Sequence, residues 1–205
     1  MFDAVDTLCE FLQVWIHQVL YQRDIYPKDS FELRNQYDVP AAMSIHPDVC
    51  QYISRFVTSV RPMIEKETCQ LVSVVVLTSD NKVLERHVCQ LTYSLATTDQ
   101  QENAQATVFQ YFRATLLKLN SLSSSLPMPS LPLYPTFRLT MELAQHADHP
   151  LKQDKFCTYW MPEDQQPPTR IDGQGQLLPV KTITIPSIKI NLFVTTDNQD
   201  LTIKK

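Results

Sequence analysis

The residues Leu20–Ile53 read LYQRDIYPKDSFELRNQYDVPAAMSIHPDVCQYI and connect two helical patterns. Before them, apolar side chains recur at helical spacing and predict a first helix. Asp3 or Asp6 can cap its start, and Pro27 prevents its continuation much beyond Asp24. The apolar positions of this helix are Val5, Leu8, Leu12, Ile16 and Val19.

A second helix is predicted from Pro47. Proline fits the first helical position because the N–H that it lacks would have no partner there, and Asp48 suits the positive end of the helix dipole. We expect this helix to end at Pro62. Its predicted buried face consists of Val49, Ile53, Phe56 and Val60.

The remaining patterns predict strands and a third helix. Gln70–Leu77 and Val83–Leu91 flank a turn at Ser79–Asn81, as in a hairpin. Thr98 and Gln101 have capping-box spacing, and a helical stripe follows them. Its positions are Val108, Phe112, Thr115, Leu116 and Leu119.

Two later segments also have strand character. Apolar residues alternate with polar ones from Phe137 to Leu143, which predicts a strand with one buried face. Lys181–Val194 predicts one further strand, bent or at a sheet edge near Pro186. Since no regular alternation of strand and helix is present, the fold class is α+β.

Composition excludes several functions. The net charge of -4 and the pI near 5.7 argue against charge-driven binding of nucleic acid. No apolar run approaches the ~20 residues that span a membrane. The only glycines are Gly173 and Gly175, so a glycine-rich phosphate loop cannot be built. Five scattered cysteines suit reduced thiols in the cytosol or nucleus.

Few residues suggest chemistry. His146, His149 and Cys157 lie close in sequence, but their spacing matches no strong zinc pattern and a fourth ligand is missing. We interpret them as solvated loop side chains, and we expect no metal, no cofactor and no enzymatic activity. Pro129, Pro132 and Pro135 have polyproline spacing, which we interpret as a stiff connection.

The segments LYQRDIYPKDSF, QYDVP and HPDVCQYI resemble the HORMA domain family, and the resemblance extends from about Leu8 to Val194. It implies three helices packed on a mostly antiparallel sheet, with a C-terminal segment that acts as a seatbelt. In this family the seatbelt passes over a partner peptide and then pairs with the sheet. We therefore expect a single HORMA domain over residues 1–205, with a core of about 3–143 and a seatbelt of about 144–205.

Two branches of the family compete. CEFLQVWIHQVLY at Cys9–Tyr21 and LLPVKT at Leu177–Thr182 are similar to the accessory subunits of translesion DNA polymerase zeta. LERHVCQL at Leu84–Leu91 fits the spindle-checkpoint branch, which binds activators of the anaphase-promoting complex, about as well. We favour the polymerase branch, which implies a nuclear location, with the cytoplasm as a second one.

The resemblance also implies partners and site residues. The first partner is a Pro-containing peptide of the polymerase zeta catalytic subunit, the second a Rev-one-type scaffold polymerase, and the third another HORMA domain in a homodimer or heterodimer. Peptide binding is carried over to Tyr26, Tyr52 and Trp160, scaffold binding to Leu177, Asn191 and Phe193, and dimerisation to Arg113.

Two of these positions, and one further position on the dimer surface, depart from the family pattern. Asn191 and Phe193 stand where the family commonly has Gln and Tyr, so the side chains are shorter or lack a hydroxyl. Leu33 stands at a basic dimer position of animal members. The alternation along Lys189–Val194 places Asn191 and Phe193 on one face of a strand.

Overall fold

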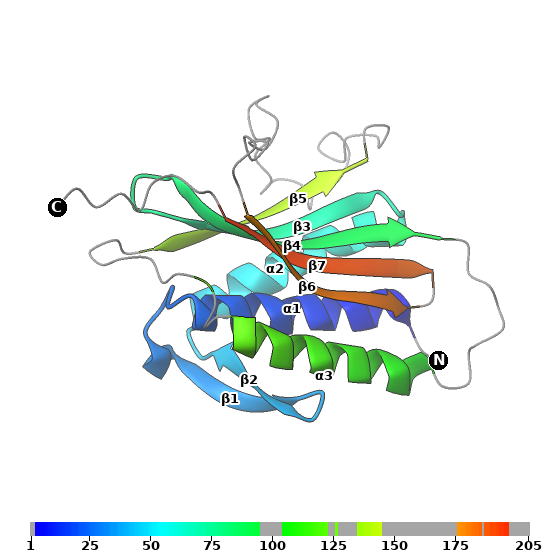
Figure 1. Cartoon of the computed structure of the whole chain (residues 1–205), viewed down its shortest axis with the longest axis horizontal. Helices are drawn as coiled ribbons and strands as arrows, with labels where there is room; N and C mark the ends of the chain where they lie inside the picture. Colours follow the sequence, from blue (N-terminus) through cyan, green and yellow to red (C-terminus); the bar gives the residue numbers. More distant parts are fainter. Residues whose placement is uncertain are drawn as a thin grey trace.

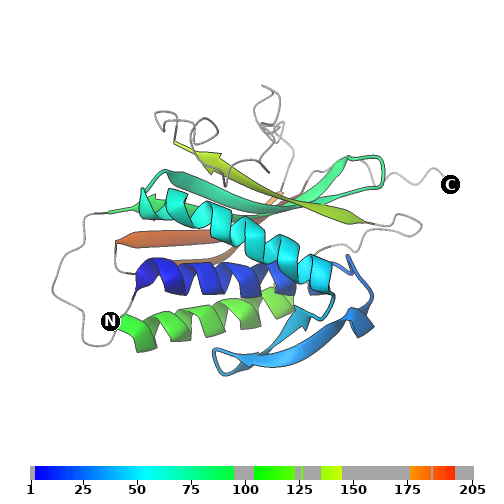
Figure 2. The same ribbon diagram turned by 180° about the vertical axis from the view of Figure 1, so that it is seen from behind.

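Three helices lie side by side against one face of a five-stranded sheet (Figures 1 and 2). The computed structural model describes residues 3–94, 104–122, 126, 135–144, 176–185 and 187–196 of the chain. Helix α1 lies between α2 and α3, and a separate two-stranded hairpin lies below them in Figure 1. This arrangement confirms the predicted α+β class.

Helix α1 spans Ala4–Gln22 and is capped as predicted. The Asp3 carboxylate accepts hydrogen bonds from the backbone N–H groups of Val5 (2.9 Å) and Asp6 (3.1 Å). Because α1 packs against its neighbours on both sides, it buries almost every side chain after its first turn.

Helix α2 spans Pro47–Glu65, one turn longer than predicted. The expectation that Pro62 ends the helix is wrong, because Pro62 lies inside its last turn. The helix continues past Pro62 because the carbonyl of Pro62 accepts from the N–H of Lys66 at 3.1 Å, and the burial of Met63 and Ile64 offsets the hydrogen bond that the proline cannot make. The predicted faces of α2 and of α3, which spans Ala104–Leu122, are buried. The capping box proposed before α3 lies outside the described residues.

The large sheet is antiparallel throughout, with the strand order β5-β3-β4-β7-β6. Strands β3 (Cys69–Leu77) and β4 (Val83–Tyr93) form the predicted hairpin. Strand β5 (Thr136–Leu143) pairs with β3, and Leu139 is its most buried side chain. The sheet therefore has β5 at one edge and β6 at the other.

The C-terminal strands correct a second expectation. Lys181–Val194 does not form one bent strand, because β6 (Gln176–Ile185) and β7 (Ile188–Thr196) are antiparallel to each other. The chain reverses direction at Ser187, whose positive φ of 68° accommodates a tight reversal. Strand β7 then pairs with β4, so this terminal hairpin extends the sheet on the side away from β5.

A hairpin of β1 (Phe31–Gln36) and β2 (Val39–Ser44) was not expected. Most β1 side chains are exposed, so the strand lacks the alternation that predicts a buried face. Tyr37 and Asp38 form its two-residue turn with φ of 52° and 59°, a conformation more typical of Asn-Gly. The hairpin forms a sheet of its own, so it does not extend the five-stranded sheet at either edge.

Two findings, on the cysteines and on membrane-spanning helices, apply only to the described part of the chain. Cys9, Cys50, Cys69 and Cys89 are free thiols there. In the same residues, no helix is both long enough and apolar enough to cross a membrane.

Candidate peptide-binding edge

Strand β5 lies at one edge of the sheet that the described residues form. It pairs with β3 on one side, and no strand of the described residues pairs with it on the other. An edge strand presents a row of backbone N–H and C=O groups that can bond to an added strand. In Figure 1, β5 lies at the far side of the sheet from β6. This edge can therefore accept an extended peptide by strand addition.

Three aromatic side chains gather beside the start of β5. The ring of Phe137 lies 6.2 Å from that of Tyr26 and 5.7 Å from that of Tyr52, both in edge-to-face geometry. Tyr52 is 45% exposed, and Tyr26 is half-buried. Burial and the nearby Tyr52 raise the pKa of Tyr26, so its hydroxyl remains a neutral donor at neutral pH. We name Tyr26, Tyr52 and Phe137 the channel aromatics.

Each channel aromatic comes from a different element. Tyr26 follows α1, Tyr52 lies in the second turn of α2, and Phe137 is the second residue of β5. Two of them were predicted from the family resemblance, and the structure places those two together. Phe137 was predicted only as a core residue. Its alternation indicated a side chain on the buried face of a strand, but only the strand order shows that β5 is an edge among the described strands.

The turn that carries Tyr26 has a helix-capping geometry. Asp24 adopts a positive φ of 50°, and the N–H of Ile25 donates to the carbonyl of Leu20 at 3.1 Å. Such a bond across the end of a helix is typical of the Schellman motif. Lys28 pairs with Asp24 at 2.6 Å and so closes the turn on its exposed side. Pro27 then directs the chain away from α1.

Trp160, the third residue predicted to bind the peptide, lies outside the described residues. The same holds for His146, His149 and Cys157. Within the described residues, no group of three or more His, Cys, Asp or Glu side chains could hold a metal ion.

The residues predicted to bind a scaffold polymerase share the face of the sheet opposite the helices. Phe193 on β7 lies opposite Pro179 on β6, and Leu177 is two residues before Pro179. Leu177 is 58% exposed. Asn191 lies on the same face of β7 as Phe193. The residues next to it along the strand point to the other face and are buried. Leu177 and Phe193 thus supply apolar surface on one side of the sheet.

Asn191 is held in a ladder of side chains across three strands. The hydroxyl of Thr182 on β6 donates to Asn191 Oδ1 at 3.0 Å. Asn191 Nδ2 in turn donates to Gln90 Oε1 on β4 at 3.3 Å. The short amide is therefore oriented within the sheet, at a position where the family commonly has a longer glutamine.

Arg113 lies on the exposed side of α3. Phe109 and Leu117 are one helical turn before and after it, and both are exposed. Leu33, on β1, is 68% exposed, the most of any large apolar side chain among the described residues. The exposed side of α3 around Arg113 thus includes the two apolar side chains of Phe109 and Leu117.

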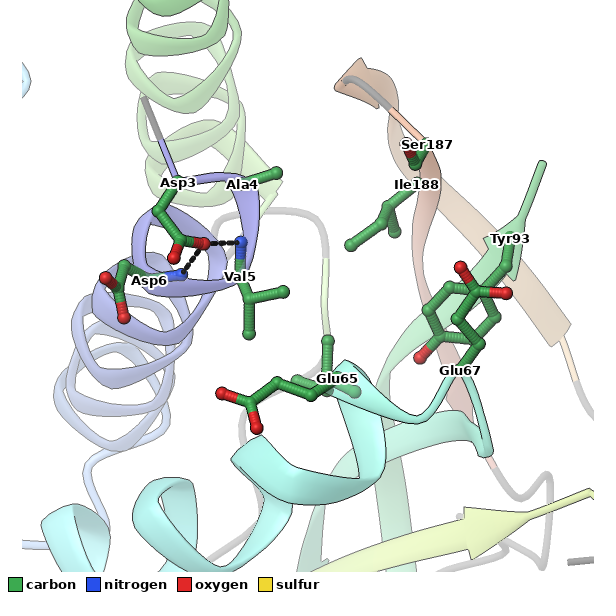
Figure 3. Close-up of a pocket in the computed structure, with 10 residues that line it drawn as sticks. Asp3, Ala4, Val5, Asp6, Glu65, Glu67, Tyr93, Ser187 and Ile188 are labelled. Atoms are coloured by element: carbon green, nitrogen blue, oxygen red, sulfur yellow. Dashed lines mark hydrogen bonds between the residues drawn. The ribbon is translucent and has the colours of Figure 1, made fainter. Parts of the chain in front are cut away.

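A separate cavity of about 450 Å³ lies near the start of α1 (Figure 3). Asp3, Glu65, Glu67, Tyr93 and Ile188 are among its lining residues. It lies near the opposite end of α1 from Tyr26, roughly 28 Å away at 1.5 Å per residue. The cavity is therefore distant from the channel aromatics, and none of its lining residues belongs to β5.

Comparisons with known proteins place this geometry in a family. The HORMA domain family model matches residues 5–168. The chain is 33% identical to the mitotic spindle assembly checkpoint protein MAD2B of Danio rerio, over 93% of this chain and 90% of the relative. It is 29% identical to the DNA polymerase zeta processivity subunit of Arabidopsis thaliana, over 92% of this chain and 83% of the relative.

Solved structures show the same fold at lower identity. A chain of the mitotic checkpoint complex has a TM-score of 0.78 at 20% identity, covering 94% of this chain and 98% of that one. C. elegans HTP-2 bound to the HIM-3 closure motif has a TM-score of 0.72 at 12% identity, covering 96% and 91%.

Fold and edge together define a protein with a HORMA-type α+β architecture, three helices on a mostly antiparallel sheet. The chain belongs to the HORMA domain family, and within it resembles the MAD2B and polymerase zeta processivity subunit relatives.

Proposed function

We propose that this protein is a non-catalytic adaptor subunit of translesion DNA polymerase zeta, which clasps a Pro-containing peptide of the catalytic subunit. The observation that carries the proposal is the position of β5 at one edge of the sheet formed by the described residues, with the channel aromatics beside its start. A similar relative named DNA polymerase zeta processivity subunit supports the choice of partner. The fold neighbour HTP-2, which is bound to a closure motif, supports the mode of binding.

The peptide adds to β5 as an extended strand. Its backbone bonds to the outward N–H and C=O groups of β5, and its proline rings pack against Tyr26, Tyr52 and Phe137. An extended proline-containing peptide loses little conformational entropy on docking. Residues of about 144–205 act as the seatbelt of a single domain, with Trp160 against the peptide. Its last part is the β6–β7 hairpin, docked on β4.

Two further surfaces complete the adaptor. Leu177, Asn191 and Phe193 bind a Rev-one-type scaffold polymerase, with the ladder from Gln90 to Thr182 holding Asn191 in place. Arg113 and its apolar neighbours on α3 bind a second HORMA domain. The protein acts in the nucleus, with the cytoplasm as a second location.

Binding of a Pro-containing peptide from the catalytic subunit tests the proposal. Isothermal titration of the purified chain should show one site per chain, and Tyr52→Ala and Trp160→Ala should each weaken it at least tenfold. Phe109→Ala is the matched control, since Phe109 is 39% exposed but lies on α3. Equal binding by wild type, Tyr52→Ala and Trp160→Ala would refute the assigned channel.

A second candidate function is binding of activators of the anaphase-promoting complex. The name of the MAD2B relatives, mitotic spindle assembly checkpoint protein, favours it. The same β5 edge would then receive a peptide of such an activator. Titration with activator peptides separates the two functions, because the polymerase proposal requires tighter binding of the catalytic-subunit peptide than of any activator peptide.

A further inference from the structure

A buried group of charged and polar side chains lies between the end of α1 and the sheet. Arg23, Glu85 and His87 are 2%, 4% and 2% exposed. Arg23 Nε donates to Glu85 Oε1 at 2.5 Å, and His87 Nε2 lies 3.0 Å from the same oxygen. These three residues are named the buried triad. Charged side chains are rarely so buried without a partner, and here each has one.

The charge of Glu85 determines where the proton lies in its hydrogen bond with His87. Burial works against a charged Glu85, but the hydrogen bond and charge of His87 and the charge of Arg23 outweigh it and hold the pKa of Glu85 below its usual value. A carboxylate can only accept hydrogen bonds. The proton must therefore sit on His87 Nε2, which donates to Glu85 Oε1.

The other ring nitrogen of His87 has no hydrogen-bond partner in the described part of the chain. Its register neighbours on the flanking strands are Val74 and Val194, which have only apolar side chains. Leaving a buried nitrogen unpaired costs stability, and an apolar aromatic ring of similar shape would avoid that cost. What histidine adds over such a ring is the Nε2–H donor to Glu85.

The buried triad is connected to the channel aromatics through the chain. Arg23 directly follows the last residue of α1 and lies three residues before Tyr26. Its side chain reaches into the protein to β4, and β3 separates β4 from β5, against which Tyr26 packs. The turn from Arg23 to Tyr26 is thus anchored to the sheet interior at its first residue and contacts the sheet edge at its last.

We propose that His87 is a positioning residue for the peptide channel, which orients the Glu85 carboxylate that holds Arg23 and thereby the turn that carries Tyr26. The inference rests on the proposed function, because it concerns the same peptide edge. His87 does not touch the peptide. It acts by restricting Glu85 Oε1 to the position where Arg23 Nε meets it, so that Tyr26 is ordered before the peptide arrives.

The test compares His87→Phe, which keeps the ring but removes the donor, with His87→Gln, which keeps a donor. Titration with the catalytic-subunit peptide should show about five- to tenfold weaker binding for His87→Phe, a partial loss of one hydrogen bond to a charged group. Binding by His87→Gln should stay within about twofold of wild type. The matched control is His17→Gln, which changes another buried histidine, one that bonds to β2 rather than to the buried triad.

A spectroscopic readout separates positioning from a general loss of stability. The Arg23 Nε–H proton should be protected from solvent exchange in NMR spectra of wild type and His87→Gln, and should exchange faster in His87→Phe. If His87→Phe does not fold, Glu85→Gln replaces it, because it removes the charge that both donors share. It should weaken peptide binding to a similar extent.

Two outcomes are distinguishable. If wild type binds the peptide and His87→Phe (or Glu85→Gln) binds it equally well, His87 is not a positioning residue, while the proposed function stands. If wild type itself fails to bind the peptide, the proposed function falls and this inference falls with it.

Discussion

His17 makes the stability of this protein depend on pH in a defined window. The imidazole lies on α1, is 4% exposed, and its Nδ1 accepts a hydrogen bond from the backbone N–H of Ser44 on β2 at 3.3 Å. Burial, and to a lesser extent the charge of Arg34, lowers the pKa of His17 from 6.5 to about 4. Protonation of His17 would place a charge in this buried site, and its Nδ1 could no longer accept the hydrogen bond from Ser44.

The sign and size follow from linkage. Because the folded-state pKa lies below the unfolded one, the unfolded chain takes up the proton first. The contribution to stability is complete above about pH 6.5 and is lost as the pH falls from 6.5 to about 4. At about 1.36 kcal/mol per pKa unit, the lowering of the His17 pKa contributes about 3 kcal/mol to the free energy of unfolding. About 2 kcal/mol of this contribution is lost by pH 5.

Urea unfolding of wild type and of His17→Gln at pH 7 and pH 5 measures this contribution. Glutamine keeps a hydrogen-bond acceptor but does not titrate, so His17→Gln should lose about 2 kcal/mol less than wild type between the two pH values. His46→Gln, at an exposed position before α2, should behave as wild type does. If wild type and His17→Gln lose the same free energy of unfolding, the reasoning about His17 is wrong.

Other features of the structure lead to further expected results. Phe112→Ala should lower the free energy of unfolding by about 3–5 kcal/mol in urea, because this fully buried ring stacks on Phe11 with centroids 4.1 Å apart; a cost below about 1 kcal/mol would mean that the stacked core is absent. Gln18→Leu should cost about 1–3 kcal/mol by thermal or urea unfolding, since Gln18 Oε1 accepts from the buried Ala42 N–H at 2.8 Å, whereas the exposed Gln51→Leu should be nearly neutral. Burial raises the pKa of Cys9 from 9.0 to about 11, so iodoacetamide at pH 8 should modify it about 100-fold more slowly in the native protein than in urea. Mass spectrometry of the labelled peptides checks this, and equal rates in both states would contradict the burial of α1.

Local patterns predicted most helices and strands because their physical causes are local. Asp3 caps α1 through its own side chain, and Pro47 opens α2 where no N–H is needed. The errors occurred where position within an element decides the outcome. The last turn of α2 continues past Pro62 because it buries Met63 and Ile64, and a reversal at Ser187 cannot be told from a bend by composition alone.

The candidate site depends on contacts that no local pattern contains. Phe137 can be assigned to the channel only from the strand order, which places β5 at an edge of the described sheet. Glu85 lies 62 residues after Arg23, so their pairing could not be read from spacing. Tyr26 and Tyr52 came from the family resemblance, since a tyrosine after a helix or within one usually just packs in the core.

Hydrogen exchange of the β5 backbone amides, with and without the Pro-containing peptide, tests the central claim most directly. Among the described strands Thr136–Leu143 pairs with β3 alone, so the amides on its other side should become more protected when the peptide adds as a strand. Unchanged exchange along β5 in a saturated complex, with new protection along β6 instead, would contradict the account.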